Sequence, residues 1–278
     1  MIVLLATTAW GQATYPDGVP DVATDLFRPS MDGGPFLATE SSGHAESAVA
    51  TFATGWARRL LLVRIDGAEE VLVEDALALH VGVRGGTRHV QLGVSAPAYP
   101  LVATDRVRAV LGDPTVDARL VTAGAHASAG LRLRVGGQLG GYLHQVGYPG
   151  PFGEIGALGE VRLGSLLVST NAGYRWVPQQ QLGEQVLDDV VWTHSAIGAQ
   201  WDGWAGSLEV MAQAQVIGGS ASPRPAAVEA LAGIQRRWDH GLIRAGVGRG
   251  VTAGVGSPAF RLVLGVSWLG RSEGTSSP

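Results

Sequence analysis

Charged side chains recur at one parity along a series of alternating segments of this chain. In each segment apolar residues occupy every second position, and small, polar or charged residues stand between them. Carboxylates and guanidiniums that share a face can pair as a rigid network, or they can line a path for ions and solutes, where an excess of arginine favours anions. The sequence predicts an inner wall that carries Asp117, Arg119, Arg132, Arg134, Glu160, Arg162, Arg175, Glu209, Glu229, Arg237, Arg244 and Arg261.

Groups that would perform catalysis or bind a metal are scattered. The histidines form no H-E-x-x-H pair, no G-x-S-x-G elbow is present, and the Gly-rich stretch 246–250 is followed by no strand-to-helix unit. Cysteine is absent, which excludes disulfides and thiol chemistry. A phospholipase barrel would need Asn, His and Ser on the outside, whereas Asn171 has inner parity. We expect no enzyme, no cofactor and no metal; a barrel protease with acidic pairs beside a histidine is the catalytic alternative.

The elements that position these residues are strands. Phe260, Leu262, Leu264, Val266 and Trp268 share one face, which is a period of two. No run of about 20 apolar residues offers a transmembrane helix, but a transmembrane strand needs only about 9–11 residues. Because no helical stretch would cover the apolar faces, lipid is their expected cover. The predicted fold is all-β, an antiparallel transmembrane up-and-down β-barrel.

Short turns and long connections alternate along the chain. Gly85-Gly86, Gly164-Ser165 and Asp202-Gly203 are tight turn signals, whereas 97–114 and 145–153 are long and rich in Gly and Pro. This asymmetry is typical of outer-membrane barrels, whose short turns are periplasmic, and it predicts about 12 strands between residues 45 and 270. Residues 60–73 form either a hairpin beyond the membrane or a continuation of the first strand.

Aromatic residues cluster near the predicted strand ends. Outer-membrane barrels place such residues in belts at the two membrane interfaces, and ordinary core aromatics beside turns are the alternative. The residues expected in these belts are Trp56, Tyr174, Trp176, Trp192, Trp201, Trp204, Trp238 and Trp268.

The two ends of the chain differ from the barrel in composition. Residues 1–13 have the apolar core and the small-x-small site of a signal peptide with a truncated basic leader; a buried first strand is the alternative. Residues 14–44 are rich in Pro, Gly, Asp and Ser and predict an extended arm or a loop region, with turn signals at Asp17-Gly18 and Asp32-Gly33-Gly34. Residues 271–278 predict a disordered tail.

Composition agrees with one large β domain. The chain has 278 residues, a net charge of −4 and no linker that would divide it, so nothing indicates nucleic-acid binding. Its 41 glycines are about twice the average usage of roughly 7% and are dispersed through the alternating segments, which suits a curved, closed sheet.

Three stretches resemble a known family. The segments 25–40 and 111–120 and the strand Asn171-Ala-Gly-Tyr-Arg175 are similar to the N-terminal barrel of OmpA-family proteins and related porin-like transporter barrels of Gram-negative bacteria. The resemblance implies a barrel in the outer membrane. The peptidoglycan-binding domain that often follows the barrel in that family has no counterpart in this sequence, so a wall-anchoring role is not carried over.

Two functions follow from these features. The first is a narrow porin-like pore or solute transporter, and the second is a closed structural barrel that serves as a membrane anchor or displays its loops for adhesion or assembly. A soluble β-sandwich or an engineered barrel is a third reading, distinguished by whether the apolar faces need detergent. The expected partners are outer-membrane lipid with lipopolysaccharide, the barrel-assembly machinery, and ions or small solutes.

Overall fold

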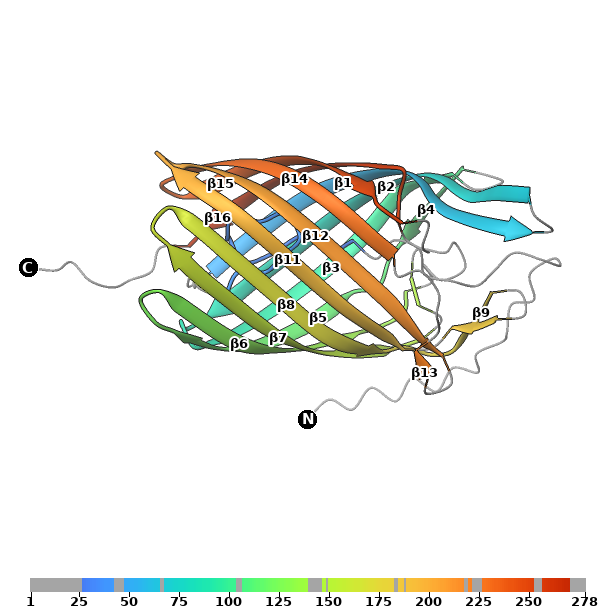
Figure 1. Ribbon diagram of the computed structural model, residues 1–278, viewed down its shortest axis with the longest axis horizontal. Coiled ribbons are helices and arrows are strands. Elements are labelled where there is room, and N and C mark those ends of the chain that lie inside the picture. Colours follow the sequence, from blue (N-terminus) through green and yellow to red (C-terminus); the bar gives the residue numbers. More distant parts are fainter. Residues whose placement is uncertain are drawn as a thin grey trace, which may run out of the picture.

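The protein is an all-β molecule whose antiparallel strands wind around one axis (Figure 1). It is seen in a computed structural model, and among its described residues no helix is long and apolar enough to cross a membrane. The predicted signal peptide, the two ends of the predicted arm and the predicted tail lie outside the described residues. The structure describes residues 27–42, 48–65, 68–103, 107–139, 147–148, 150–182, 185–187, 189–217, 220–221, 227–252 and 257–270.

The strands follow one another along the described chain with no other regular structure between them. They are β1 (Ala48–Ile65), β2 (Ala68–Gly86), β3 (Val90–Ala103), β4 (Val107–Leu111), β5 (Thr115–Ala123), β6 (Ala127–Gly136), β7 (Phe152–Leu163), β8 (Leu166–Trp176), β9 (Gln180–Leu182), β10 (Gln185–Leu187), β11 (Val190–Trp201), β12 (Trp204–Ile217), β13 (Ser220–Ala221), β14 (Ala227–Trp238), β15 (Gly241–Gly250) and β16 (Phe260–Leu269).

Twelve of these strands form a closed wall. Each pairs with the wall strands that come before and after it along the chain, and the first and last strands, β1 and β16, pair with Val49 opposite Leu269. Strands β4 and β13 extend the wall beyond one end, and β9 and β10 form a separate pair. The predicted antiparallel up-and-down barrel of about 12 strands is confirmed.

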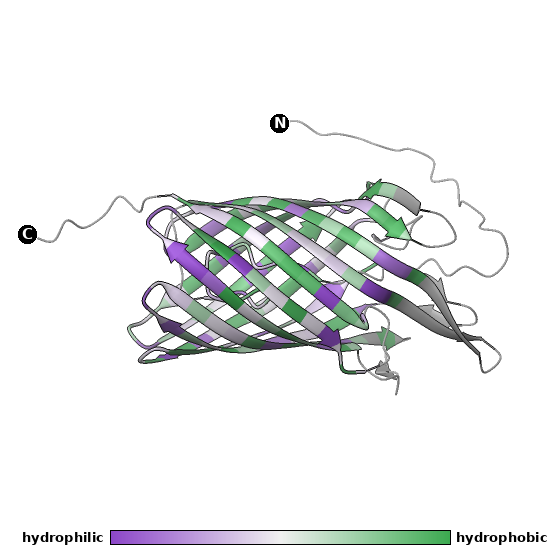
Figure 2. Ribbon diagram, turned by 90° about the horizontal axis from the view of Figure 1, so that it is seen from above, coloured by the Kyte–Doolittle hydropathy of each residue, from purple (hydrophilic) through white to green (hydrophobic). Residues whose placement is uncertain are grey.

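Alternation along each strand separates the two faces of the wall. On β6, Leu131 and Leu133 are more than half exposed on the outside, whereas Arg132 between them is buried inside. Figure 2 shows hydrophobic and hydrophilic residues interspersed along the strands in this way. An outer face of exposed leucine and valine is stable only in lipid, so the wall spans a membrane.

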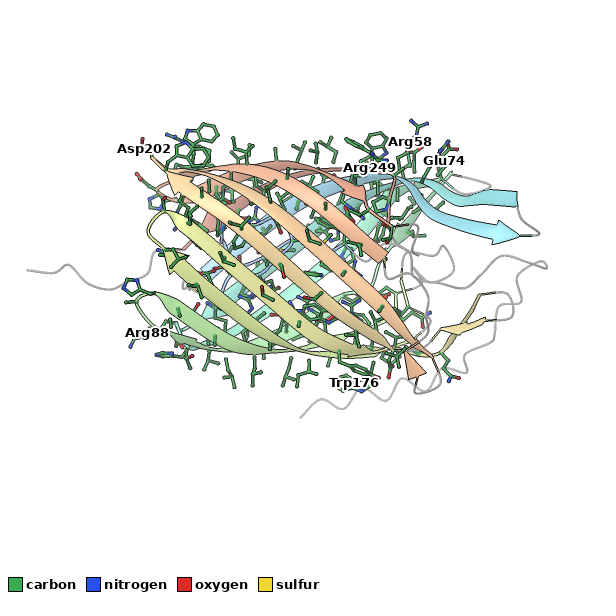
Figure 3. The ribbon with its side chains drawn as sticks, viewed as in Figure 1. Arg58, Glu74, Arg88, Trp176, Asp202 and Arg249 are labelled. Atoms are coloured by element: carbon green, nitrogen blue, oxygen red, sulfur yellow. The ribbon has the colours of Figure 1, made fainter. Side chains whose placement is uncertain are left out.

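The two ends of the barrel have different connections. At one end the strands are joined by short turns; at Asp202-Gly203 both residues have positive φ, 45° and 77°, as a two-residue hairpin turn requires. Arg88 and Asp202 mark this end in Figure 3, and Arg58 and Glu74 mark the opposite end. The other end carries the longer connections. That the longer connections face outward from the cell stays a prediction.

Strands β1 and β2 project beyond the wall at the end with long connections. Pairing with β16 stops at Arg58, and Arg59 then takes a left-handed conformation with φ 51° where the register with β2 shifts. Beyond this bulge, side chains of β1, β2 and β3 including Leu60, Val73 and Tyr99 form a small buried cluster. Residues 60–65 and 68–73 therefore continue β1 and β2, and the two strands pair with each other beyond the bulge.

A loop that precedes β1 lies inside the barrel. Residues 27–42, here called the lumen segment, bury Phe27, Phe36 and Leu37 against the inner wall (Figure 1, blue trace). The segment folds back on itself, since the Ser30 N–H donates to the Leu37 carbonyl at 2.7 Å and the Asp32 carboxylate accepts from Ser30 Oγ and Gly34 N–H. Of the two alternatives for this stretch, an extended arm and a loop, residues 27–42 form the loop, because Asp32 closes a compact turn.

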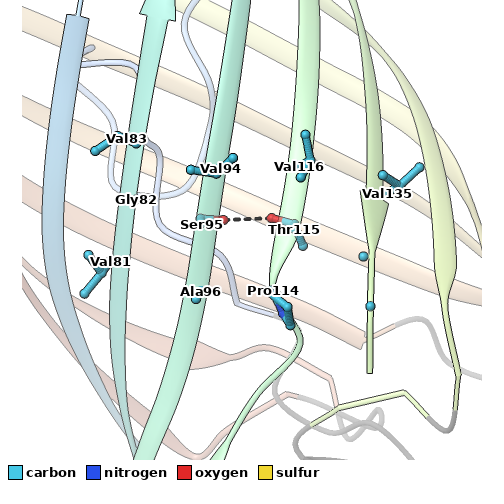
Figure 4. Close-up of a pocket in the computed structure, with 12 residues that line it drawn as sticks. Val81, Gly82, Val83, Val94, Ser95, Ala96, Pro114, Thr115, Val116 and Val135 are labelled. Atoms are coloured by element: carbon cyan, nitrogen blue, oxygen red, sulfur yellow. Dashed lines mark hydrogen bonds between the residues drawn. The ribbon is translucent and has the colours of Figure 1, made fainter. Parts of the chain in front are cut away.

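A shallow apolar groove crosses the outside of β2, β3, β5 and β6 (Figure 4). Its volume is about 580 Å³, and its base includes Ser95 and Thr115, whose hydroxyls hydrogen bond at 2.7 Å on the inner side. The exposed valines that line it belong to the lipid-facing surface: Val81, Val83, Val94, Val116 and Val135.

Candidate functional site: an arginine cluster around Glu40

Strand register aligns charged residues across the inner wall. Asp117 on β5 lies opposite Arg134 on β6, which lies opposite Glu154 on β7, which lies opposite Arg175 on β8. Arg119 and Arg132 form the next inward pair on β5 and β6. The period of two places each side chain inside, and the register turns them into a continuous charged band.

Arg84 joins this band from β2 by reaching across β3. The residue opposite it on β3 is Gly93, where a Cβ atom would lie 2.8 Å from the Asp117 carboxylate and 3.2 Å from Arg84 Nε. The missing side chain lets Arg84 Nη2 donate to Asp117 Oδ1 at 2.6 Å. Gly93 thus leaves room for an ion pair between β2 and β5 across the strand that separates them.

The carboxylate of Glu40 from the lumen segment lies among four wall arginines. Its Oε2 atom is 2.6 Å from Arg119 Nη2 and 2.5 Å from Arg132 Nη1. Its Oε1 atom is 3.3 Å from Arg134 Nη2 and 3.7 Å from Arg84 Nη2. All five side chains are buried or nearly so, so water screens these interactions little.

The wall supplies only part of the negative charge that these arginines need. Asp117 pairs with Arg84, and Glu154 pairs with Arg132 and, at 2.6 Å, with Arg175. Arg119 is different, since its described carboxylate partners are Glu40 and Asp32, both in the lumen segment. The segment therefore completes the charge balance of the band.

The main chain of Glu40 is also bound by the wall. Its carbonyl oxygen accepts from Ser169 Oγ at 3.1 Å and from Asn171 Nδ2 at 3.0 Å, both on β8. Trp192 on β11 stacks on the guanidinium of Arg132, with Cζ 4.9 Å from the ring centroid. The expected place of Trp192 in an interfacial belt is wrong, because its parity turns it into the lumen, where it is 2% exposed.

Other wall residues hold the rest of the lumen segment. Glu209 on β12 accepts from the backbone N–H groups of Leu37, Ala38 and Thr39. Arg244 on β15 donates to the carbonyls of Ser30 and Phe36 at 3.0 and 3.1 Å.

Near the start of the segment, Arg261 on β16 lies over the Phe27 ring at 4.7 Å and pairs with Glu229 at 2.7 Å. Toward its end, Ser41 donates to Glu160 on β7. Arg162 and Arg237, also predicted for the inner wall, are half-buried near the short turns.

Tyr148 packs beside the band at the end with long connections. Tyr148 Oη hydrogen bonds to Arg175 at 2.9 Å, and its ring packs on Phe152 with centroids 5.0 Å apart. The backbone N–H of Tyr148 donates to Asp113, which follows β4, at 2.7 Å. Burial raises the pKa of the Asp113 carboxyl above its usual range, although the hydrogen bond from Tyr148 opposes this shift.

The remaining predicted belt residues lie at the barrel ends. Trp201, Trp204, Trp238 and Trp268 are exposed beside the short turns, and Trp176 is exposed at the opposite end (Figure 3). Two others are half-buried at that opposite end: Trp56 donates to Asp75 at 3.0 Å, and Tyr174 donates to Asp189. Their role in membrane interfaces stays a prediction.

Sequence reasoning missed several residues of the cluster. Arg84 and Glu154 have the inner parity of their strands, so the alternation could have found them. Asp32 and Glu40 lie in a stretch without periodicity, and nothing local marks them as partners of the wall.

Comparison with known proteins places the fold. No protein-family model matches the chain, and no curated protein matches it in sequence. Among solved structures, an outer membrane channel from Pseudomonas putida F1 is 13% identical with a TM-score of 0.62, over 81% of this chain and 96% of that one. The translocator domain of the autotransporter NalP from Neisseria meningitidis is 9% identical with a TM-score of 0.50, over 80% and 87%.

This is the fold of a Gram-negative outer-membrane β-barrel. The fold confirms the location predicted from the sequence, which is the outer membrane of a Gram-negative bacterium. The matches are to outer-membrane barrels of several kinds, so they support the general barrel resemblance and not the narrower OmpA-family assignment.

The expectation that the chain is no enzyme is corrected by these matches. They include the outer membrane phospholipase A from Escherichia coli, 10% identical over 81% of this chain and 97% of that one, with a TM-score of 0.40. The likeness is too distant to assign this chain an activity.

Proposed function

We propose that the protein is a narrow porin-like channel for small solutes, whose lumen is closed when the lumen segment is bound. The observation that supports this most is the pairing of Glu40 with Arg84, Arg119, Arg132 and Arg134. A barrel that needed only rigidity could pair its wall charges with each other. Here the wall has more guanidiniums than its own carboxylates match, and a separate segment supplies the remainder.

The contacts of the segment suit a reversible closure. Within the described residues it pairs with no strand of the wall. It is held by polar contacts to Glu209, Arg244 and the arginine cluster, and by the buried apolar side chains near its ends and middle. Water can accept from the N–H groups that Glu209 binds and can donate to the carbonyls that Arg244 binds. Because the segment is not part of the sheet, its release would break no backbone ladder of the barrel. The outer wall would meet lipid, including lipopolysaccharide, and the barrel-assembly machinery would insert it.

A disulfide tether tests the proposal directly, because the chain has no native cysteine. A Cβ atom at Gly233 would lie 2.9 Å from Leu37 Cγ, the position that a cysteine sulfur would take. We expect the oxidised L37C/G233C variant to be silent in a planar bilayer and to conduct after reduction. Thr51→Cys with Ser267→Cys is the matched control, since these hydroxyls are 2.7 Å apart within the wall and a bond there leaves the segment untethered.

One feature favours the structural alternative. The projecting part of β1 and β2 is stiffened by a buried cluster with β3, as a loop-display platform would require. If neither the wild type nor a variant without residues 27–42 conducts when fully inserted, the channel proposal is overturned and the platform is favoured.

A further inference from the structure

The arginine cluster has the composition of an anion-binding site. The wall arginines that meet there outnumber the wall carboxylates that pair with them, which are Asp117 and Glu154. If Glu40 leaves, Arg119 keeps no described carboxylate partner from the wall. A buried guanidinium without a counter-charge is costly, so another anion would be bound in its place. The arginines of the cluster are Arg84, Arg119, Arg132, Arg134 and Arg175.

Several N–H groups of these arginines have no hydrogen-bond acceptor in the described part of the chain. The Nε atoms of Arg84, Arg119, Arg132 and Arg134 are buried and hydrogen bond to nothing in the described part of the chain. Guanidinium groups present several N–H donors in a planar fork that matches a carboxylate. The cluster therefore has N–H donors beyond those that bind Glu40.

A second binding point fixes the length of the anion that could replace Glu40. Ser169 and Asn171 donate to the Glu40 carbonyl while the arginines bind its carboxylate, so the wall binds both ends of one residue. Glutarate has the same carbon skeleton as Glu40 from the carbonyl carbon to the carboxylate carbon. Its second carboxylate would accept from the same hydroxyl and amide donors.

We infer that Glu40 occupies a binding site for short dicarboxylate solutes, and that such a solute competes with it for the wall. This inference rests on the proposed channel function and names its substrate class. The lumen segment would be released when the solute takes the place of the Glu40 side chain, which couples opening to the presence of the solute.

Calorimetry on the full-length protein folded in detergent tests the site without relying on conduction. We expect glutarate to bind at least about tenfold more tightly than propionate, because propionate cannot reach Ser169 and Asn171. Glu40→Gln should tighten glutarate binding about tenfold, since a neutral amide competes less for the guanidiniums. Arg119→Gln should weaken binding by about the same factor.

Arg162→Gln is the matched control, an arginine of the same wall that contacts neither Glu40 nor the cluster in the described structure; it should leave binding unchanged. If Arg119→Gln does not fold, Asn171→Leu tests the other end, and it should reduce the preference for glutarate over propionate. Absence of glutarate binding to Glu40→Gln, or equal loss in Arg162→Gln, overturns the inference. A barrel that conducts without binding glutarate refutes only the site, whereas one that binds glutarate and never conducts refutes only the channel.

Discussion

At the scale of single residues, one wall carboxylate organises the turn of the lumen segment. Glu209 accepts from the N–H groups of Leu37, Ala38 and Thr39, the last at 2.8 Å. Three consecutive backbone donors inside a barrel need an acceptor, because water does not reach them freely. Leu37 also fits against Gly233 and Gly246, where a Cβ atom would lie 2.8 and 2.1 Å from its Cδ1.

Replacing Glu209 with Gln should loosen this turn while the barrel stays intact. The amide keeps one acceptor but loses the charge, and a hydrogen bond to a charged group is worth roughly 1.5–3 kcal/mol, so amide exchange at residues 37–39 should rise roughly 10- to 100-fold. Hydrogen exchange measured by mass spectrometry checks this. Glu74→Gln is the control, since Glu74 is exposed and pairs with Arg58 at 3.9 Å; unchanged exchange in Glu209→Gln would contradict the assigned role.

At the scale of elements, the short turns set the register of the wall. Trp201 and Trp204 lie opposite each other across Asp202-Gly203, and that register continues to Val190 opposite Gln215. A two-residue turn with both residues at positive φ matches the twist of the strands it joins. The inward positions of β11 and β12, including Trp192 and Glu209, therefore depend on this turn.

The Gly203→Ala variant should destabilise the barrel by about 1–2 kcal/mol, because a Cβ atom is disfavoured at φ 77°. Urea unfolding in a detergent or lipid environment that permits reversibility measures the change. Gly137→Ala is the matched control, since no atom lies within 4 Å of a Cβ at that position and its φ is not in the left-handed region. Equal stability of the two variants would refute the argument for the turn.

At the scale of the whole molecule, the outer surface is an apolar band around a polar interior. Leu131 lies at the middle of β6 beside Leu120 and Ala157, and it is 54% exposed. Leu163 has similar exposure but precedes the Gly164-Ser165 turn at the barrel end. In lipid these two sites differ in depth, whereas in water they would be equivalent.

Leu131→Arg should therefore cost about 2–4 kcal/mol of folding free energy in a bilayer, and Leu163→Arg about 0–1 kcal/mol. Folding titrations in vesicles compare the two variants directly. Equal free-energy costs for the two variants would show that the outer face at Leu131 does not contact the core of the bilayer.

The alternation of the strands was readable from the sequence because each of its causes is local. A period of two assigns every residue of a strand to one face, so the inner parity of Asp117, Arg132 and Arg175 follows from their neighbours. The turn at Asp202-Gly203 depends on the φ preference of two adjacent residues. The same parity places Trp192 inside, against its expected place in a belt.

The composition of the site was decided by the tertiary structure. Arg84 meets Asp117 across Gly93, and Glu40 meets Arg119 from 79 residues away, through strand register and chain path that no local preference encodes. The lumen segment has no periodicity, so its sequence indicated only turns. Its position follows from a charge balance with the closed wall, because an excess of buried guanidiniums exists only after the barrel has closed and brought them together.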